Sequence, residues 1–210
     1  MARRIVAILS AVFLAVAILS ISVLRVASVN YAFNGSLAST LGETTNVGEI
    51  DVSYEFPYPG RILPDHPLWP IKALRDKVWV TLTLNSSRRA ELLLLFADKR
   101  IASSKILFER GKPELAFSTL SKAEKYLAEA LDLETENRKG GVDTKSFLTQ
   151  LATASLKHRE VINEILMIAP EDARPEIIKV ENYARDVYKD SRNILHSLGM
   201  SAPENPFNGD

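Results

Sequence analysis

The sequence predicts an all-α protein with an N-terminal transmembrane helix, a flexible stalk and an antiparallel bundle of about five helices. Residues 5–24 form an uncharged apolar run, and residues 26–60 contain no Lys or Arg and are rich in Ser, Thr, Gly and Asn. From residue 61 onward, apolar residues recur every three or four positions, and glycines occur only at the breaks between these runs. This pattern is typical of helices that pack through one apolar face.

The apolar run at residues 5–24 predicts a membrane-spanning helix and therefore a lipid bilayer as partner. Its 20 residues, at about 1.5 Å each, span roughly 30 Å, the thickness of the hydrocarbon layer. Arg3 and Arg4 precede the run and only Arg25 follows it closely, so the N-terminus is expected in the cytoplasm and the C-terminal domain outside. The alternative is a signal peptide cleaved after residue 27 or 32, which would give a secreted protein. Signal-peptide cores usually have about 7–15 residues, so a single-pass signal anchor over residues 1–25 is favoured.

Residues 26–60 predict a flexible stalk that lifts the domain off the membrane. An anionic membrane surface would repel the acidic side chains of this segment, which favours a spacer over a lipid-binding segment. These acids are Glu43, Glu49, Asp51 and Glu55.

The helical bundle is expected over residues 61–198, outside the cytoplasm, and is followed by a frayed tail at 199–210. Proline and glycine at the breaks set the helix ends. The expected helices span about 67–84, 86–110, 113–137, 143–168 and 174–198.

The first helix also carries a strand-like pattern, because "VWVTLTLN" alternates between β-branched or apolar and polar positions. A helix is nevertheless favoured, since Ile71, Leu74, Val78 and Leu82 share one helical face and no comparable second strand exists. The second and third helices are joined only by residues 111–113, so they must form an antiparallel hairpin.

The remaining helices carry clear apolar stripes. The third presents Leu115, Ala116, Leu120, Ala123, Leu127, Ala130 and Leu131; the fourth presents Phe147, Leu151, Ala154, Val161, Ile165 and Ile168; and the fifth presents Ile177, Val180, Ala184, Val187, Ile194 and Leu198.

Composition excludes several classes of function. The chain has no cysteine, which excludes disulfides, thiolate metal sites and a cysteine nucleophile. Its net charge is zero, so no nucleic-acid partner is expected. No phosphate-binding glycine loop, nucleophile elbow or catalytic triad order is visible. We therefore expect no catalytic residues, no metal and no cofactor.

His158 is the one residue that suggests a site, because it lies on an apolar stripe between Ala154 and Val161. A core or boundary histidine whose nitrogens find local partners is favoured, since no second ligand lies one turn away. The alternative is a sensor or enzyme that uses a groove between helices, with His158 and Tyr183 or Tyr188 as its polar groups.

Two glycosylation sequons begin at Asn34 and Asn85. Asn85 also suits the N-cap of the second helix, and this structural role is favoured.

The hairpin of the second and third helices resembles a tetratricopeptide repeat. A further alternative is therefore an interaction hairpin of that type. That repeat uses helices of about a dozen residues in recurring units of about 34. The helices here are about twice as long and no second copy is found, so a bundle is favoured.

The Pro-rich motif "LPDHPLWPIK", followed by an Arg-Ala-Glu-Leu helix, resembles a domain-of-unknown-function family of signal-bearing, often membrane-anchored prokaryotic proteins. The resemblance covers about residues 58–135. It implies an exported helical domain, and no activity or catalytic residue comes with it. The matching motif residues are Leu63, Pro64, Asp65, Pro67, Leu68, Trp69, Pro70 and Lys72.

Together these patterns predict a membrane-anchored extracytoplasmic domain with a binding or structural role at the cell envelope, possessing no enzymatic activity. Another envelope protein is a candidate partner.

Overall fold

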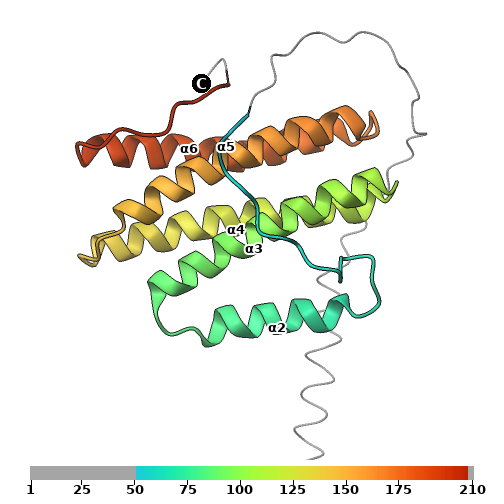
Figure 1. Ribbon diagram of the computed structural model, residues 1–210, viewed down its shortest axis with the longest axis horizontal. Coiled ribbons are helices and arrows are strands. Elements are labelled where there is room, and N and C mark those ends of the chain that lie inside the picture. The colour runs from blue at the N-terminus through green and yellow to red at the C-terminus, as the bar shows by residue number, and fades with distance from the viewer. Residues whose placement is uncertain (1–50, 208–210) are drawn as a thin grey trace, which may run out of the picture. The chain divides into compact units, whose positions relative to one another are not determined.

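The computed structural model describes residues 51–207, and this part of the chain is all-helical, with five α-helices and no strand (Figure 1). The helices are α2 (Trp69–Leu82), α3 (Ser86–Glu109), α4 (Pro113–Lys139), α5 (Lys145–Ile168) and α6 (Arg174–Ser197). The all-α prediction is confirmed for this part, and each predicted helix end lies within two residues of the observed one. The predicted transmembrane helix at 5–24 lies outside the described residues. Among residues 51–207, no helix is long and apolar enough to cross a membrane.

Local sequence explains the helix ends. Asn85 caps α3 as predicted, because its side-chain oxygen accepts a hydrogen bond from the Arg88 backbone N–H at 2.9 Å. The turn between α3 and α4 needs Gly111, whose φ of +69° lies in the left-handed region. Pro113 then opens α4, where a missing backbone N–H costs little.

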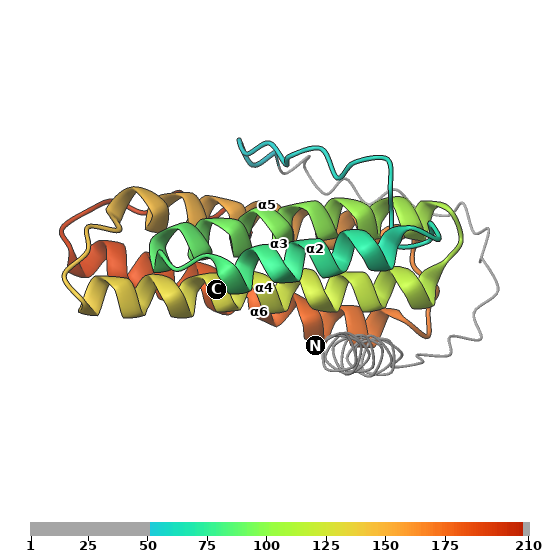
Figure 2. The same ribbon diagram turned by 90° about the horizontal axis from the view of Figure 1, so that it is seen from below.

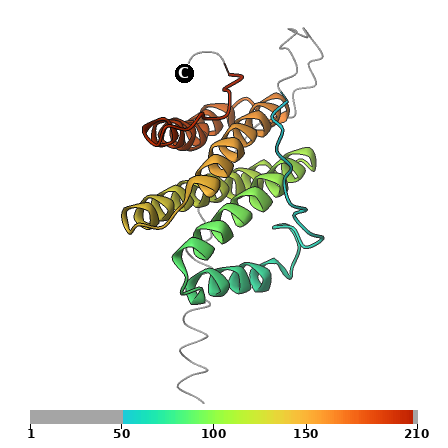
Figure 3. The ribbon, with the colours of Figure 1, turned by 60° about the vertical axis from the view of Figure 1, so that its left-hand side comes forward.

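Helices α3–α6 form the bundle, and α2 lies outside it. The α3–α4 and α5–α6 hairpins make the most extensive helix contacts, and α4 also packs against α6 and α3 against α5. Seen from the side, α2 lies beyond α3, on the side of the bundle away from α6 (Figure 3). Its only substantial helix contact is with α3. The five-helix bundle is thus a four-helix bundle with one peripheral helix.

The apolar face of α2 points away from the protein. Ile71, Leu74, Val78 and Leu82 are exposed by 68%, 50%, 45% and 72%, and we call these four residues the α2 surface. The only buried residue of α2 is Asp76. The predicted helix is confirmed, but its apolar face does not face the core.

The chain before α2 lies along the bundle. Residues 51–60, which we call the strap, run across α5 and α3 on one side of the bundle (Figure 2). Val52 is buried in the main core, and its backbone N–H donates to Glu160 Oε2 at 2.7 Å. The part of the expected stalk that the structure describes is therefore packed against the helices, because its apolar side chains find a groove in the bundle.

The C-terminal segment also folds back, although a frayed tail was expected from residue 199. Phe207 is buried, and the Arg159 guanidinium lies 4.2 Å from its ring centre. The Tyr188 hydroxyl donates to the Pro203 carbonyl at 2.8 Å. These contacts fix the tail as far as residue 207.

Candidate functional site

His158 lies at the centre of the bundle between two carboxylates from two other helices. Its side chain is fully buried on α5. Nδ1 lies 2.7 Å from Glu124 Oε1 of α4, and Nε2 lies 3.1 Å from Asp98 Oδ1 of α3. We call Asp98, Glu124 and His158 the ionic cluster. One imidazole therefore links α3, α4 and α5 at the same level of the bundle.

The cluster favours a protonated, positively charged His158. Burial by itself lowers the pKa of an imidazole, but here the charge of Glu124 and the hydrogen bonds to Asp98 and Glu124 outweigh burial and raise the pKa to about 9. At neutral pH both ring nitrogens then carry protons and both donate to carboxylates. The second oxygen of Glu124, Oε2, is buried without a hydrogen-bond partner. Both ring nitrogens of His158 are thus hydrogen-bonded, while one carboxylate oxygen of Glu124 is left without a partner.

Tyr54 connects the strap to this cluster. Its hydroxyl donates to Asp98 Oδ2 at 2.7 Å, so both oxygens of Asp98 accept hydrogen bonds. Burial and the negative charge of Asp98 raise the pKa of Tyr54 and keep it a donor. Phe56 adds an edge-on contact with the His158 ring, with ring centres 5.3 Å apart. The strap therefore closes one side of the ionic cluster.

The arrangement suits a structural link better than a reacting centre. Both nitrogens of His158 are engaged, and His158 and Glu124 have no exposed surface. A substrate would reach His158 only after the strap moved. Removing one member of a buried ionic group leaves a charge unpaired, so the cluster fixes the relative positions of its three helices and the strap.

The sequence favoured a core or boundary histidine with local partners, and the core position of His158 is confirmed. Its partners are not local, because they lie 34 and 60 positions away on α4 and α3. Tyr183 and Tyr188, the polar groups of the alternative, lie on α6, where Tyr183 is two-fifths exposed and Tyr188 bonds the tail. The actual partners, Asp98 and Glu124, were missed. A signal for them exists: Glu124 lies between Leu120 and Leu127, within the apolar stripe of its helix.

The Pro-rich motif fastens the start of α2 to the rest of the domain. Asp65 Oδ2 accepts from Arg110 at 3.0 Å and from Lys112 at 2.8 Å, so it joins the motif to the α3–α4 turn. Lys72 Nζ donates to the Pro59 and Ile62 carbonyls at 2.7 Å and 2.9 Å.

The other motif residues differ in their burial. Leu63 is buried, Trp69 is half-buried under Lys72, and Leu68 is exposed. Pro70 lies in the first turn of α2 as expected, and Pro64 and Pro67 lie in the turns before it. The motif acts as a rigid junction of the described fold.

The two sequons remain predictions of modification. Asn34 lies outside the described residues. Asn85 is exposed at the α2–α3 junction, where it also acts as N-cap.

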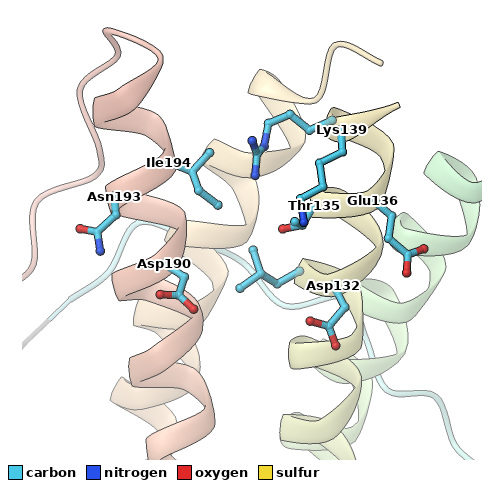
Figure 4. A pocket seen from close by; sticks show the side chains of 9 residues that line it. Asp132, Thr135, Glu136, Lys139, Asp190, Asn193 and Ile194 are labelled. Carbon is cyan, nitrogen blue, oxygen red and sulfur yellow. The ribbon is translucent and has the colours of Figure 1, made fainter. Parts of the chain in front are cut away.

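The surface of the described residues also carries open grooves, among them the following two. One, of about 670 Å³, lies beside the strap and is lined by Tyr54, Phe56, Asp98 and Gln150, among others. The second, of about 520 Å³, lies between the C-terminal parts of α4 and α6 (Figure 4). Asp132, Glu136 and Lys139 stand on its α4 wall, and Asp190 stands on its α6 wall. Within residues 51–207, no group of three or more His, Asp or Glu side chains is arranged to hold a metal ion.

The fold and this centre define an all-helical domain organised around a buried ionic cluster. Residues 61–172, more than half of the chain, match the family described as domain of unknown function (DUF5667), and the chain belongs to that family. The match includes most of the range that carried the resemblance and extends it through α5. No curated protein and no solved structure matches the chain.

Proposed function

We propose that this chain is a membrane-anchored extracytoplasmic domain with a binding role at the cell envelope, and that the α2 surface is its contact surface. The observation that carries the proposal is the exposure of the α2 surface. Four large apolar side chains on one side of one helix lie in water, while most apolar stripe residues of the other helices are buried or half-buried. An ordered apolar stripe of this kind is characteristic of an interaction site.

The attachment of α2 supports this role. The Pro-rich motif and Lys72 hold the start of α2 to the strap and to the α3–α4 turn. Trp79 packs edge-on against Phe96 of α3, with ring centres 6.2 Å apart. The helix is therefore presented in a fixed orientation, which reduces the entropy lost on binding. We propose that this presentation is what the Pro-rich motif contributes in the family.

The anchor is supported by the sequence of residues 1–25 alone. Protease treatment of intact cells tests it, because an extracytoplasmic domain is digested or released, whereas a domain that stays protected contradicts the topology. An N-terminus that begins after residue 27 or 32 would instead support the secreted form.

The contact surface is tested by placing a photoreactive side chain at position 74 or at position 178 of the full chain in cells. Leu74 and Ile178 are both 50% exposed, so they are matched controls on α2 and α6. We expect covalent adducts, to protein or to lipid, from position 74 and few from position 178. Recovery of the unmodified monomer from both variants would contradict a binding role for α2.

A sensor that uses the groove beside the strap is a second candidate, favoured by the position of Tyr54 and Asp98 in its lining. A ligand there would displace the strap and change the surroundings of His158. The nuclear magnetic resonance signals of the His158 ring report this directly. Their insensitivity to a library of small molecules, in a sample with the strap intact, would count against the candidate.

A further inference from the structure

We infer that the α2 surface docks on a lipid bilayer with anionic headgroups, so that α2 lies along the membrane–water interface. This inference rests on the proposed function, because it names the partner of the proposed contact surface. Three features support a bilayer as the partner: the shape of the stripe, its flanking charges and the part of the chain that precedes the strap.

The α2 surface is a continuous stripe along the whole helix. From Ile71 to Leu82 it extends about 16 Å, at 1.5 Å per residue. Trp79, which is half-exposed, lies beside it, and Leu84, which is almost fully exposed, follows the helix end. A short helix with an apolar face and a tryptophan is suited to burial at the headgroup boundary.

Basic side chains flank this stripe. With about 100° between successive residues, Arg75 and Lys77 lie on opposite sides of it, and both are exposed. The only acid of α2, Asp76, is buried and accepts hydrogen bonds from Arg75 at 2.6 Å and 3.0 Å. With Lys72, the helix carries three cations against one anion. Lys and Arg beside an apolar stripe can reach headgroup phosphates while the apolar side chains enter the acyl boundary.

The same charges disfavour a second copy of this chain as the occupant. An antiparallel pair of α2 helices would bring the two Arg75 side chains together along one edge of the contact and the two Lys77 side chains together along the other. Neither copy offers an exposed acidic side chain on α2 to pair with them, because Asp76 is buried. Like charges across a small contact destabilise the pair. An anionic surface has the complementary charge.

The preceding chain brings a bilayer within reach. Residues 5–24 are an apolar run predicted to span the membrane, and residues 25–50 separate it from the strap. These 26 residues can extend to about 90 Å, which leaves the domain free to approach the surface. Tethering makes the contact intramolecular and raises its effective concentration. A weak apolar contact is then sufficient.

The test uses the full chain reconstituted in vesicles of phosphatidylcholine with phosphatidylglycerol, with and without lipids brominated on their acyl chains. Bromine quenches indole fluorescence on contact. The chain has two tryptophans, so Trp69→Phe leaves Trp79 as the sole reporter. Both leaflets have the same composition, and the readout is therefore independent of the orientation of insertion.

We expect brominated lipid to reduce Trp79 fluorescence at least about two-fold, and less in phosphatidylcholine alone or at high salt. The double variant Leu74→Asp/Val78→Asp should lose this quenching, while Ile178→Asp on α6 should retain it. Unquenched Trp79, or quenching that the double variant retains, overturns the inference and points to a protein partner.

A second measurement separates dimerisation from lipid contact. The chain has no cysteine, so Thr81→Cys introduces a single thiol beside the α2 surface. Efficient disulfide-linked dimers at a low ratio of protein to lipid would overturn the inference in favour of a second copy, and monomer supports it. Flotation of the vesicles after alkaline extraction tests the anchor by itself. Loss of the chain from the vesicles contradicts the proposed anchoring, whereas retention with unquenched Trp79 contradicts only the docking of α2.

Discussion

Helices α6 and α2 both carry apolar residues every three or four positions. The apolar face of α6 points into the bundle, whereas the apolar face of α2 points into water. In α6, Ile177, Val180, Ala184 and Val187 are all buried, because α4 and α5 cover that side. In α2, whose contacts with other helices are with α3, the corresponding stripe is in water and the buried side chain is Asp76. Amphipathicity thus identifies the apolar face of a helix, but the neighbours available in the chain decide whether that face is covered.

The largest expected effect compares Ile177→Asp with Leu74→Asp. Ile177 is completely buried, so a carboxylate there should cost about 4 kcal/mol or more of the free energy of unfolding. Leu74→Asp should change it by less than about 0.5 kcal/mol. Urea unfolding in detergent micelles, followed by circular dichroism, measures both. If Ile177→Asp does not fold, Ile177→Ala should still lose about 2–4 kcal/mol. Equal losses at positions 177 and 74 would mean that α2 packs through the α2 surface.

Next in size is His158→Gln, which leaves two buried carboxylates without their common cation. A loss of about 3–5 kcal/mol is expected, because breaking a buried ionic group by removing one partner leaves uncompensated charge. His196→Gln, at an exposed position in the last turn of α6, is the control and should lose less than about 0.5 kcal/mol. A small loss at position 158 would show that Asp98 and Glu124 do not need the imidazolium.

The free energy of unfolding should depend on pH through the protonation of His158. The pKa of His158 is raised from 6.5 to about 9 in the folded state, so its contribution is complete below pH 6.5, declines between 6.5 and 9 and is lost above 9. The decline amounts to roughly 3 kcal/mol. Unfolding curves at a series of pH values measure it. In His158→Gln this slope should be absent, and a wild-type stability that rises over the same range would contradict the protonated cluster.

Tyr54→Phe should reduce the free energy of unfolding by a smaller amount and should act mainly on the strap. It removes the hydrogen bond to Asp98 Oδ2 and should cost about 1–3 kcal/mol, because a buried carboxylate oxygen loses its donor. Hydrogen exchange of the Val52 amide should quicken at the same time. Tyr58→Phe, at a largely exposed strap residue, should leave both measurements unchanged. Unchanged exchange in Tyr54→Phe would mean that the strap is held by its apolar contacts alone.

The smallest effect is expected for Asp65→Asn, which weakens the link between the Pro-rich motif and the α3–α4 turn. Arg110 and Lys112 hold the pKa of Asp65 below its usual range, but both are about half-exposed. The loss should therefore stay below about 1 kcal/mol and shrink further in high salt. A salt-independent loss would indicate a structural change and not a lost ion pair.

The sequence predicted the helices well because their ends depend on local chemistry. Pro70, Pro113 and Gly111 act within one or two residues of their position, and the apolar stripes of α4–α6 leave little choice of face. The orientation of α2 was not predictable in this way, because it depends on how much surface the other helices leave uncovered.

The ionic cluster and the strap escaped prediction for a related reason. Asp98, Glu124 and His158 are each separated by more than 25 positions, and they meet only when the axial positions of α3, α4 and α5 are fixed. A carboxylate within an apolar stripe indicates a buried partner but not which helix supplies it. The strap has no helical period, so its packing depends on single contacts such as Val52 and Tyr54.

The order of attachments along the strap determines how the domain responds to mechanical force. A pull on the chain at residue 51 reaches the Asp51–Lys157 ion pair and the Val52 hydrogen bond first, both on α5, and then the Tyr54 hydrogen bond to α3. Only when these bonds have broken does the load pass to the Lys72 contacts with Pro59 and Ile62, and from there to α2. A pull at residue 51 would therefore strain the middle of the bundle before it reached α2.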